Sequence, residues 1–164
     1  MTTATLAYRD FKITGGYQWD HHSFDAAVID FWMSRGALAD RQSAERRLRD
    51  LILVVQNRDD DIIGISTSYL EFRPRLNHHA MMYRTFVDQP FRGSRLMIRM
   101  IDRTYDILNA ASIGGAPIGL IAETENPKLM KSGVQKQMSR LGFELLGMNQ
   151  QQQHVWLRMF DHLS

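Results

Sequence analysis

Residues 85–96 have the sequence TFVDQPFRGSRL. This stretch predicts a strand up to Val87, a short loop centred on Arg92-Gly93, and the first turn of a long helix. The first amides of a helix have no intrahelical acceptor, so they point beyond the N-terminus and can bind an anion. The helix dipole adds about half a positive charge there, and Arg92 and Arg95 add their own charges. The stretch therefore indicates a site for a phosphate-bearing ligand, with a plain turn and solvated arginines as the alternative.

The composition is that of one globular domain. Of the 164 residues, 44% are hydrophobic and 23% are charged, and we expect a single domain over residues 1–164. The absence of cysteine excludes disulfides, thiolate nucleophiles and cysteine metal sites. The N-terminal sequence MTTAT lacks the basic start and apolar segment of a signal peptide, and no apolar run approaches the ~20 residues that cross a bilayer. We therefore expect a cytoplasmic protein without a membrane partner.

Arginine dominates the basic residues, with sixteen arginines against four lysines and a net charge of +2. Arginine suits bidentate phosphate contacts better than lysine. Four of the arginines lie between residues 41 and 49, but Asp40, Glu45 and Asp50 are interleaved with them. This pattern favours a salt-bridged helix surface, so a nucleic acid stays an open but not favoured partner.

The periodicity of apolar residues predicts the order strand, two helices, three strands, helix, strand, helix, two strands. The predicted strands cover residues 6–13, 51–56, 62–72, 80–87, 118–123, 144–148 and 154–160, and the predicted helices begin near residue 23, after Asp40, near Ser94 and at Asn126-Pro127. The three consecutive strands predict an antiparallel meander. The helix that follows them leads to a right-handed crossover and one parallel pair.

Two motifs and one single residue accompany this order of elements. Val87 precedes the Arg92-Gly93 pair by five residues, Arg140-Leu141-Gly142-Phe143 ends the last helix, and Asn126 follows the fifth strand. In these features and in its element order, the chain resembles the GNAT superfamily of acyltransferases over nearly its whole length. The resemblance implies an α/β (α+β) fold: a mixed, mostly antiparallel sheet of about seven strands, with helices on both faces and one β-α-β crossover.

The resemblance also implies a function. GNAT proteins bind acetyl-coenzyme A, so we expect an acyl-CoA-dependent N-acyltransferase that moves an acetyl group to a primary amine by direct attack in a ternary complex. Backbone groups of the strand end would pair with the pantetheine arm like an added strand, and amides of the loop and first helical turn would hold the pyrophosphate. The implied cofactor-binding residues are Thr85, Phe86, Val87, Arg92, Gly93, Ser94, Arg95, Leu96, Met97 and Asn126.

The phosphate loop departs from the family pattern. The family commonly has Arg-Gly-x-Gly-x-Gly or Ala, whereas here Arg95 and Met97 stand where small residues let the backbone approach the pyrophosphate. Neither residue is forbidden in a helix, because only positive φ demands glycine. We therefore expect coenzyme A to bind, with Arg95 reaching a phosphate. A partly blocked loop is the alternative.

A second departure concerns the proton donor to the leaving thiolate. The tyrosine that GNAT members often carry four residues before the late glycine is replaced by Met138. A thiol with a pKa of ~8.5 is a tolerable leaving group without such a donor, and Ser132, Ser139 or a water are other candidates. A catalytically inactive binding or regulatory module, or an acyltransferase acting on a nucleic acid, is the alternative function.

The general base is expected among the carboxylates at the end of the fifth strand. Glu123 and Glu125 are the first choices to deprotonate an acceptor ammonium, and Tyr83 on the fourth strand is the next. For Glu125, a solvated or helix-capping carboxylate is the alternative. An ion pair with a nearby arginine is the simpler explanation of Glu71.

The two histidine pairs, His21-His22 and His78-His79, do not predict a metal site. Adjacent side chains on a strand point to opposite faces and cannot chelate together, so we expect no metal. The sequence leaves two further questions open: the identity of the acceptor, a small molecule or a protein, and whether the chain forms a homodimer.

Overall fold

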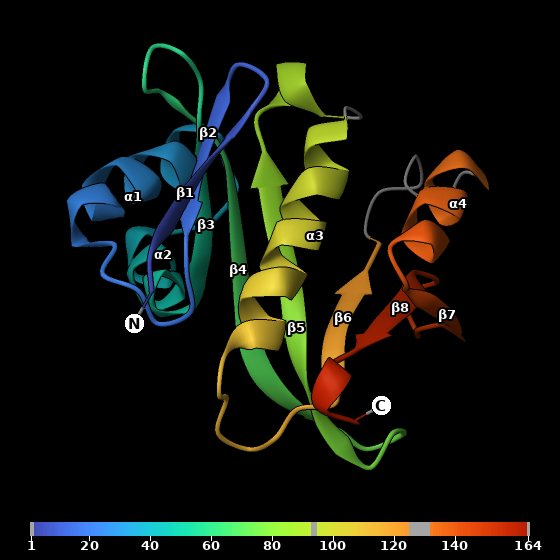
Figure 1. The fold of residues 1–164 in the computed structure, drawn as a ribbon. Coiled ribbons are helices and arrows are strands. Elements are labelled where there is room, and N and C mark those ends of the chain that lie inside the picture. Colours follow the sequence, from blue (N-terminus) through green and yellow to red (C-terminus); the bar gives the residue numbers. More distant parts are fainter. Residues whose placement is uncertain (1, 93–94, 125–131, 164) are drawn as a thin grey trace. The chain divides into compact units, whose positions relative to one another are not determined.

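The computed structural model describes residues 2–92, 95–124 and 132–163, which form a mixed sheet of eight strands with four α-helices (Figure 1). In chain order the elements are β1 (Ala4–Tyr8), β2 (Phe11–Gly15), α1 (Asp25–Ser34), α2 (Arg41–Arg47), β3 (Leu51–Gln56), β4 (Ile62–Arg73), β5 (His78–Val87), α3 (Arg95–Ala110), β6 (Gly119–Glu123), α4 (Ser132–Arg140), β7 (Glu144–Met148) and β8 (His154–Met159). The order in the sheet is β1-β2-β3-β4-β5-β6-β8-β7. β5 and β6 run parallel, whereas β1–β2, β2–β3, β3–β4, β6–β8 and β7–β8 are antiparallel. The predicted mostly antiparallel sheet with one parallel pair is confirmed.

The chain forms two compact units, each with its own core. One comprises the chain up to Ser68 and Arg84–Ile107, and the other comprises Tyr69–Tyr83 and Leu108–Ser164. We refer to them as unit 1 and unit 2. Because the boundaries fall inside β4, β5 and α3, these three elements each contribute residues to both units.

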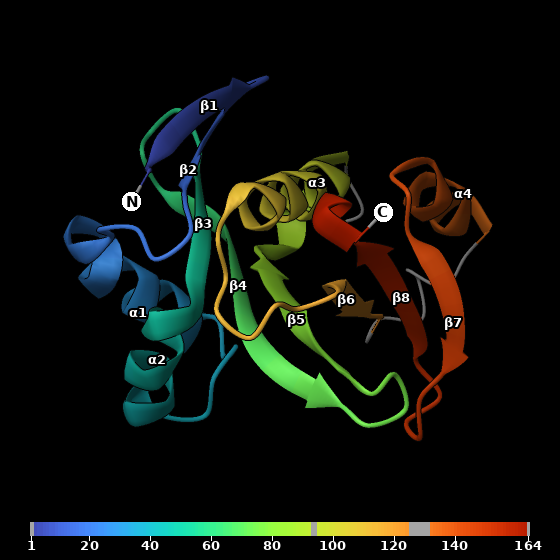
Figure 2. The same cartoon turned by 60° about the horizontal axis from the view of Figure 1, so that its bottom comes forward.

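Unit 1 has helices on both faces of its strands (Figure 2). Phe31 and Trp32 of α1 pack in one apolar cluster with Ile65 of β4. The neighbouring residue Ser66 points the other way, as strand geometry requires, and its Oγ lies 2.9 Å from Oγ1 of Thr104 on α3. The expected two-sided arrangement of helices is therefore confirmed in this unit.

Gly64 is a point of close packing between β4 and α3. A Cβ added there would lie 3.3 Å from the Sδ and Cε atoms of Met100, which is closer than an ordinary van der Waals contact. Met100 is fully buried. The small residue thus lets the helix lie close to β4.

Unit 2 has its apolar cluster on β5, β6 and β8. The cluster contains Ala80, Met82, Ile118, Ile121, Val155 and Leu157. β6 lies between the other two strands: its ladder with β5 joins Met81–Tyr83 to Leu120–Ala122, and its ladder with β8 ends at the pair Glu123↔Val155. β6 is therefore a buried strand whose last residue carries a carboxylate.

The single N-terminal strand predicted over residues 6–13 is wrong. β1 and β2 form a hairpin, with Tyr8 opposite Phe11 and a two-residue turn at Arg9-Asp10. Arg9 adopts φ 52°, a conformation that hairpin turns usually give to Gly, Asn or Asp. Arg9 is not one of these residues, so the sequence has no local signal for the turn. The hairpin adds an eighth strand to the sheet.

The predicted cap of α2 is confirmed. The Asp40 carboxylate accepts a hydrogen bond from the Ser43 amide at 2.7 Å, and this bond lowers the pKa of Asp40. The end of α4 also agrees, since Gly142 adopts φ 93° after the helix. The predicted starts of two helices, at Ser94 and at Asn126-Pro127, lie outside the described residues.

Candidate functional site

One candidate site is the end of β5 in unit 1. β5 continues from Arg84 to Val87 beyond Tyr83, the last of its residues in the ladder with β6. Within this extension Thr85 is half-buried, and its Oγ1 donates to the Ile65 carbonyl at 3.2 Å. The extension is anchored to β4 on that side, and Val87 is buried.

Asp88 fixes the direction in which the chain leaves β5. Its amide donates to the Ile63 carbonyl at 2.8 Å, and its carboxylate accepts from the Gln89 amide at 3.1 Å. The same carboxylate lies 3.2 Å from Nε of Arg35. A short 3-10 turn, Gln89–Phe91, follows and leads to Arg92.

Arg92 folds back over the strand end. Its Nε donates to the Val87 carbonyl at 2.7 Å, and its guanidinium lies 5.0 Å from the centre of the Phe86 ring. Phe86 itself packs edge-on against Phe31 of α1, with 5.7 Å between ring centres. No carboxylate among the described residues forms an ion pair with Arg92. The guanidinium is therefore oriented by neutral groups and keeps its charge available.

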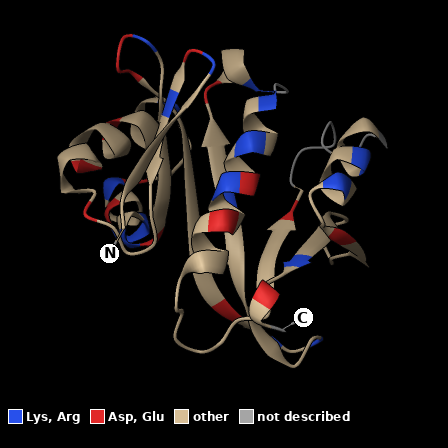
Figure 3. Cartoon of the chain, viewed as in Figure 1, with Lys and Arg blue, Asp and Glu red and all other residues tan. Residues whose placement is uncertain are grey.

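The N-terminal end of α3 is basic (Figure 3). From that end, the charged residues are Arg95, Arg99, Asp102, Arg103 and Asp106. The helix dipole favours acids at the N-terminus, and the first turn of α3 contains no acid. A basic first turn is unfavourable for the helix alone and suits a bound anion.

The predicted cofactor-binding residues differ in exposure. Arg92 and Arg95 are exposed, Met97 is half-buried, and Leu96 is 1% exposed. Leu96 therefore contributes to the core. Gly93, Ser94, Glu125 and Asn126, which complete the predicted set, lie outside the described residues.

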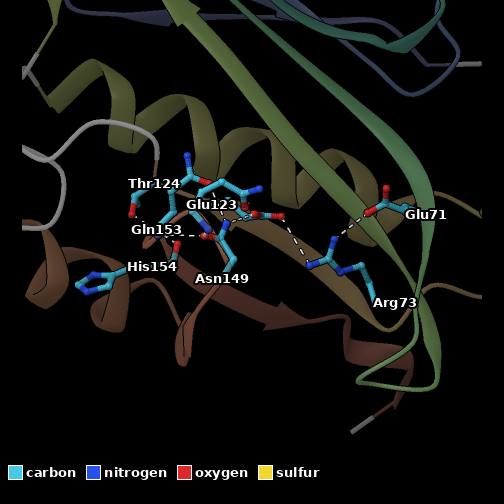
Figure 4. A network of polar contacts seen from close by, with 8 residues as sticks. Glu71, Arg73, Glu123, Thr124, Asn149, Gln153 and His154 are labelled. Carbon is cyan, nitrogen blue, oxygen red and sulfur yellow. Dashed lines mark hydrogen bonds and ion pairs between the residues drawn. The ribbon is translucent and has the colours of Figure 1, made fainter.

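A separate candidate site surrounds Glu123 at the end of β6 in unit 2 (Figure 4). Its carboxylate has a partner on each oxygen. Oε1 lies 3.6 Å from Nη2 of Arg73 on β4, and Oε2 accepts a hydrogen bond from Nδ2 of Asn149. The Glu123 side chain is 24% exposed, so a ligand can still reach it.

The partners of Glu123 are themselves held in place. Arg73 donates from Nη1 to Oε2 of Glu71 at 2.8 Å, which confirms the predicted ion pair of Glu71. Asn149 begins the turn between β7 and β8, and its Nδ2 also donates to Oε1 of Gln153 at 2.7 Å. Arg73 and Asn149 thus reach Glu123 from two different elements.

Tyr83 does not join this cluster. In the ladder it pairs with Ala122, the residue before Glu123. Successive side chains of a strand point to opposite faces, so Tyr83 and Glu123 lie on opposite faces of the sheet. The structure therefore separates two residues that the sequence offered as alternatives for one role.

The sequence did not predict that Arg73, Asn149 and Gln153 lie around Glu123. The four glutamines from residue 150 to 153 indicate a polar hairpin loop, but nothing local connects Asn149 with Glu123. The connection arises because β8 lies between β6 and β7 in the sheet. It depends on pairings between strands far apart in the chain.

Among the described residues, no three His, Asp or Glu side chains gather where they could hold a metal ion. None of the described helices combines the length and hydropathy needed to cross a bilayer.

Comparison with known proteins relates the chain to solved structures only. No family model matches the sequence, and no curated protein matches it. Ribosomal-protein-S5-alanine acetyltransferase from Vibrio fischeri aligns with a TM-score of 0.64 at 15% identity, over 98% of this chain and 99% of that one.

Two further structures have the same fold. A GCN5-related N-acetyltransferase from Kribbella flavida aligns with a TM-score of 0.61 at 15% identity, over 92% of this chain and 98% of that one. An acetyltransferase candidate from Salmonella typhimurium, solved with its cofactor acetyl-CoA, aligns with a TM-score of 0.58 at 13% identity, over 92% and 94%. Identities this low establish the fold alone, and the fold is that of the GNAT acetyltransferases.

Proposed function

We propose, from the GNAT fold of this chain, that it is an N-acetyltransferase that uses acetyl-coenzyme A and acts on a primary amine. One observation carries the proposal: the first turn of α3 contains Arg95 and no acid. Without a bound anion, a base at this end costs helix stability. With a diphosphate at the N-terminus, the same charge becomes favourable.

The described residues at this end of α3 fit such a ligand. Arg92 is oriented through Nε and stacked on Phe86, which leaves its two Nη groups to donate to phosphate oxygens. Arg95 is exposed in the first turn of the helix, and the family resemblance adds the backbone of Leu96 and Met97. We assign the pyrophosphate to these groups, together with Gly93 and Ser94.

The backbone of Thr85, Phe86 and Val87 is assigned to the pantetheine arm. These residues extend β5 past its ladder with β6, and an extended ligand can add to such a segment as a strand does. Asn126 belongs to the assigned residues by the family resemblance alone.

Glu123 is the proposed general base. Bound acetyl-coenzyme A supplies an activated acetyl thioester, which only a neutral amine can attack. The Glu123 carboxylate would take the proton from the acceptor's ammonium, directly or through a water. The amine nitrogen then forms a bond to the acetyl carbon while the bond to sulfur breaks. Glu125 and Tyr83 are the other candidates for this role.

The leaving thiolate has no donor at the position where the family often has one. Met138 is buried, with 4% of its surface exposed, and its thioether carries no proton. This observation favours the second candidate function, a module that binds coenzyme A without transferring its acyl group. A thiol pKa of ~8.5 makes transfer without a donor feasible, and we therefore prefer the enzyme.

Calorimetry and a thiol-release assay together test the proposal. Acetyl-coenzyme A should bind the purified chain, and a panel of small primary amines and amine-terminated peptides should release free coenzyme A in its presence. Binding without release for every amine supports the inactive module. Absence of binding contradicts both functions.

A further inference from the structure

We infer that Asn149 and Arg73 are positioning residues that hold the Glu123 carboxylate in one orientation. This inference rests on the proposed function, because it assigns Glu123 the role of base. It adds two residues to the site and makes the β7–β8 turn part of it. The evidence is the set of contacts in Figure 4.

The Glu123 carboxylate is held at both oxygens. Arg73 lies 3.6 Å from Oε1, and Asn149 donates to Oε2. The two contacts come from separate elements, β4 and the turn after β7, so rotation of the carboxylate breaks one contact or the other. A proton acceptor fixed in this way needs no reorganisation when the substrate binds.

Asn149 is fixed in turn by the backbone of its own loop. Its Oδ1 accepts from the amides of Gln151 at 3.0 Å and Gln153 at 2.9 Å. A side-chain amide has one acceptor oxygen and one donor nitrogen. The atom that faces the two backbone amides must therefore be the oxygen. The NH2 group must then face Glu123 and the Gln153 side chain. The geometry of the turn thus sets the direction of the bond to Glu123.

Arg73 is anchored in a similar way from β4. Its short contact is to Glu71, at 2.8 Å, and its longer contact is to Glu123, at 3.6 Å. The Glu71 pair keeps the guanidinium near Glu123 without a tight bond to it. Two carboxylates share one guanidinium, so the group carries one net negative charge, which suits a cationic amine acceptor.

The competing explanation is that these contacts only tie the β7–β8 turn to β6. Asn149→Asp separates the two explanations, because the carboxylate still accepts from the two backbone amides but no longer donates to Glu123. We expect kcat to fall by about ten- to a hundredfold, the scale for a misplaced catalytic group, with the dissociation constant of acetyl-coenzyme A unchanged. Gln151→Ala is the matched control in the same turn, since only the backbone amide of Gln151 takes part, and its kcat should stay at the wild-type value.

A double-mutant cycle tests whether Asn149 affects kcat through the Glu123 carboxylate. In a Glu123→Gln background, Asn149→Asp should cause no further loss of kcat, because Asn149 acts only through that carboxylate. Losses that multiply would overturn the inference. At the other contact, Arg73→Lys should retain more of kcat than Arg73→Gln. Equal losses in these two variants would remove Arg73 from the inference.

The side-chain amide signals of Asn149 in a proton–nitrogen NMR spectrum test the geometry without any assay. In the wild type they should exchange with water more slowly than those of Gln150, and Glu123→Gln should shift them. Exchange as fast as that of Gln150 would overturn the inference even if the enzyme is active. If no amine is acetylated, the proposed function fails, while these signals still decide whether Asn149 holds Glu123.

Discussion

Arg95 is the residue that most separates this chain from the usual GNAT loop, in which small residues stand close to the pyrophosphate. It begins α3, is exposed, and forms no ion pair with any described carboxylate. An arginine in the first helical turn adds a mobile charge where glycine would add space. Replacing Arg95 therefore tests whether its side chain strengthens or weakens the binding of acetyl-coenzyme A.

For Arg95, we expect both Arg95→Gly and Arg95→Ala to weaken acetyl-coenzyme A binding, because each removes a charge next to the phosphates. Glycine also loosens the helix by up to ~1 kcal/mol relative to alanine, so the alanine variant isolates the charge. Calorimetry gives both dissociation constants. Tighter binding in the alanine variant would mean that Arg95 obstructs the site.

Arg92 offers a second prediction for affinity. Arg92→Ala should weaken acetyl-coenzyme A binding by ~1.5–3 kcal/mol, the range for charge-assisted hydrogen bonds. Arg103→Ala is the matched control, because it removes the same charge from α3 at a point about 12 Å along the helix axis from Arg95. Equal affinities of wild type and Arg92→Ala in calorimetry would exclude Arg92 from the phosphate site.

A third prediction concerns the effect of Glu123 on kcat. Glu123→Gln keeps an acceptor for the Asn149 amide but cannot take a proton at neutral pH, so kcat should fall by about a hundredfold or more while cofactor affinity changes little. Steady-state kinetics and calorimetry on the same samples separate the two quantities. Wild-type kcat in this variant would make Glu123 a structural residue and turn attention to Glu125 or Tyr83.

At the scale of elements, the N-terminus of α2 provides a prediction about pH. The hydrogen bond from the Ser43 amide holds the pKa of Asp40 below its ordinary value of 3.8. A carboxyl whose pKa is lower in the folded state adds stability above the unfolded value and loses it as the pH falls through the folded value. Asn also caps a helix but does not titrate.

The wild type should therefore lose stability relative to Asp40→Asn as the pH falls from neutral to below 3.8. Urea unfolding of both proteins across this range measures the difference. A difference that does not change with pH would mean that the charge of Asp40 contributes nothing to the cap.

Most elements could be predicted because their signals are local. The boundaries of β3 were predicted to the residue, and those of β4 and β5 to within two residues. The β1–β2 turn could not be predicted, because Arg9 adopts its positive φ without a residue that favours it. Long-range ion pairs surround this turn, from Arg58 to Asp10 and from Lys12 to Asp60.

The residues of the candidate sites also divide into those with a local sequence signal and those without one. Arg92 follows a predicted strand and Glu123 ends one, so their places along the chain could be inferred from the sequence. Asn149 and Arg73 could not, because they meet Glu123 through a sheet order that runs β5-β6-β8-β7. No local pattern encodes that order.

At the scale of the whole molecule, the three elements that belong to both units predict cooperative unfolding. Trp32 lies in unit 1 and Trp156 in unit 2, both buried. Two variants should each keep one of these residues as the sole tryptophan. In both, the urea midpoint measured by tryptophan fluorescence should coincide with the midpoint measured by far-UV circular dichroism. Separate midpoints in either variant would show that one unit unfolds first.

The hydrogen bonding of the β7–β8 turn also has a consequence for directed evolution. The loop is held by the side chain of Asn149 and by backbone amides, so the side chains of Gln150 and Gln151, both exposed, carry no part of its geometry. A library randomised at these two positions would vary the exposed side chains of the turn while its backbone geometry stays intact. With Asn149 left unchanged, such a library should keep the orientation of Glu123.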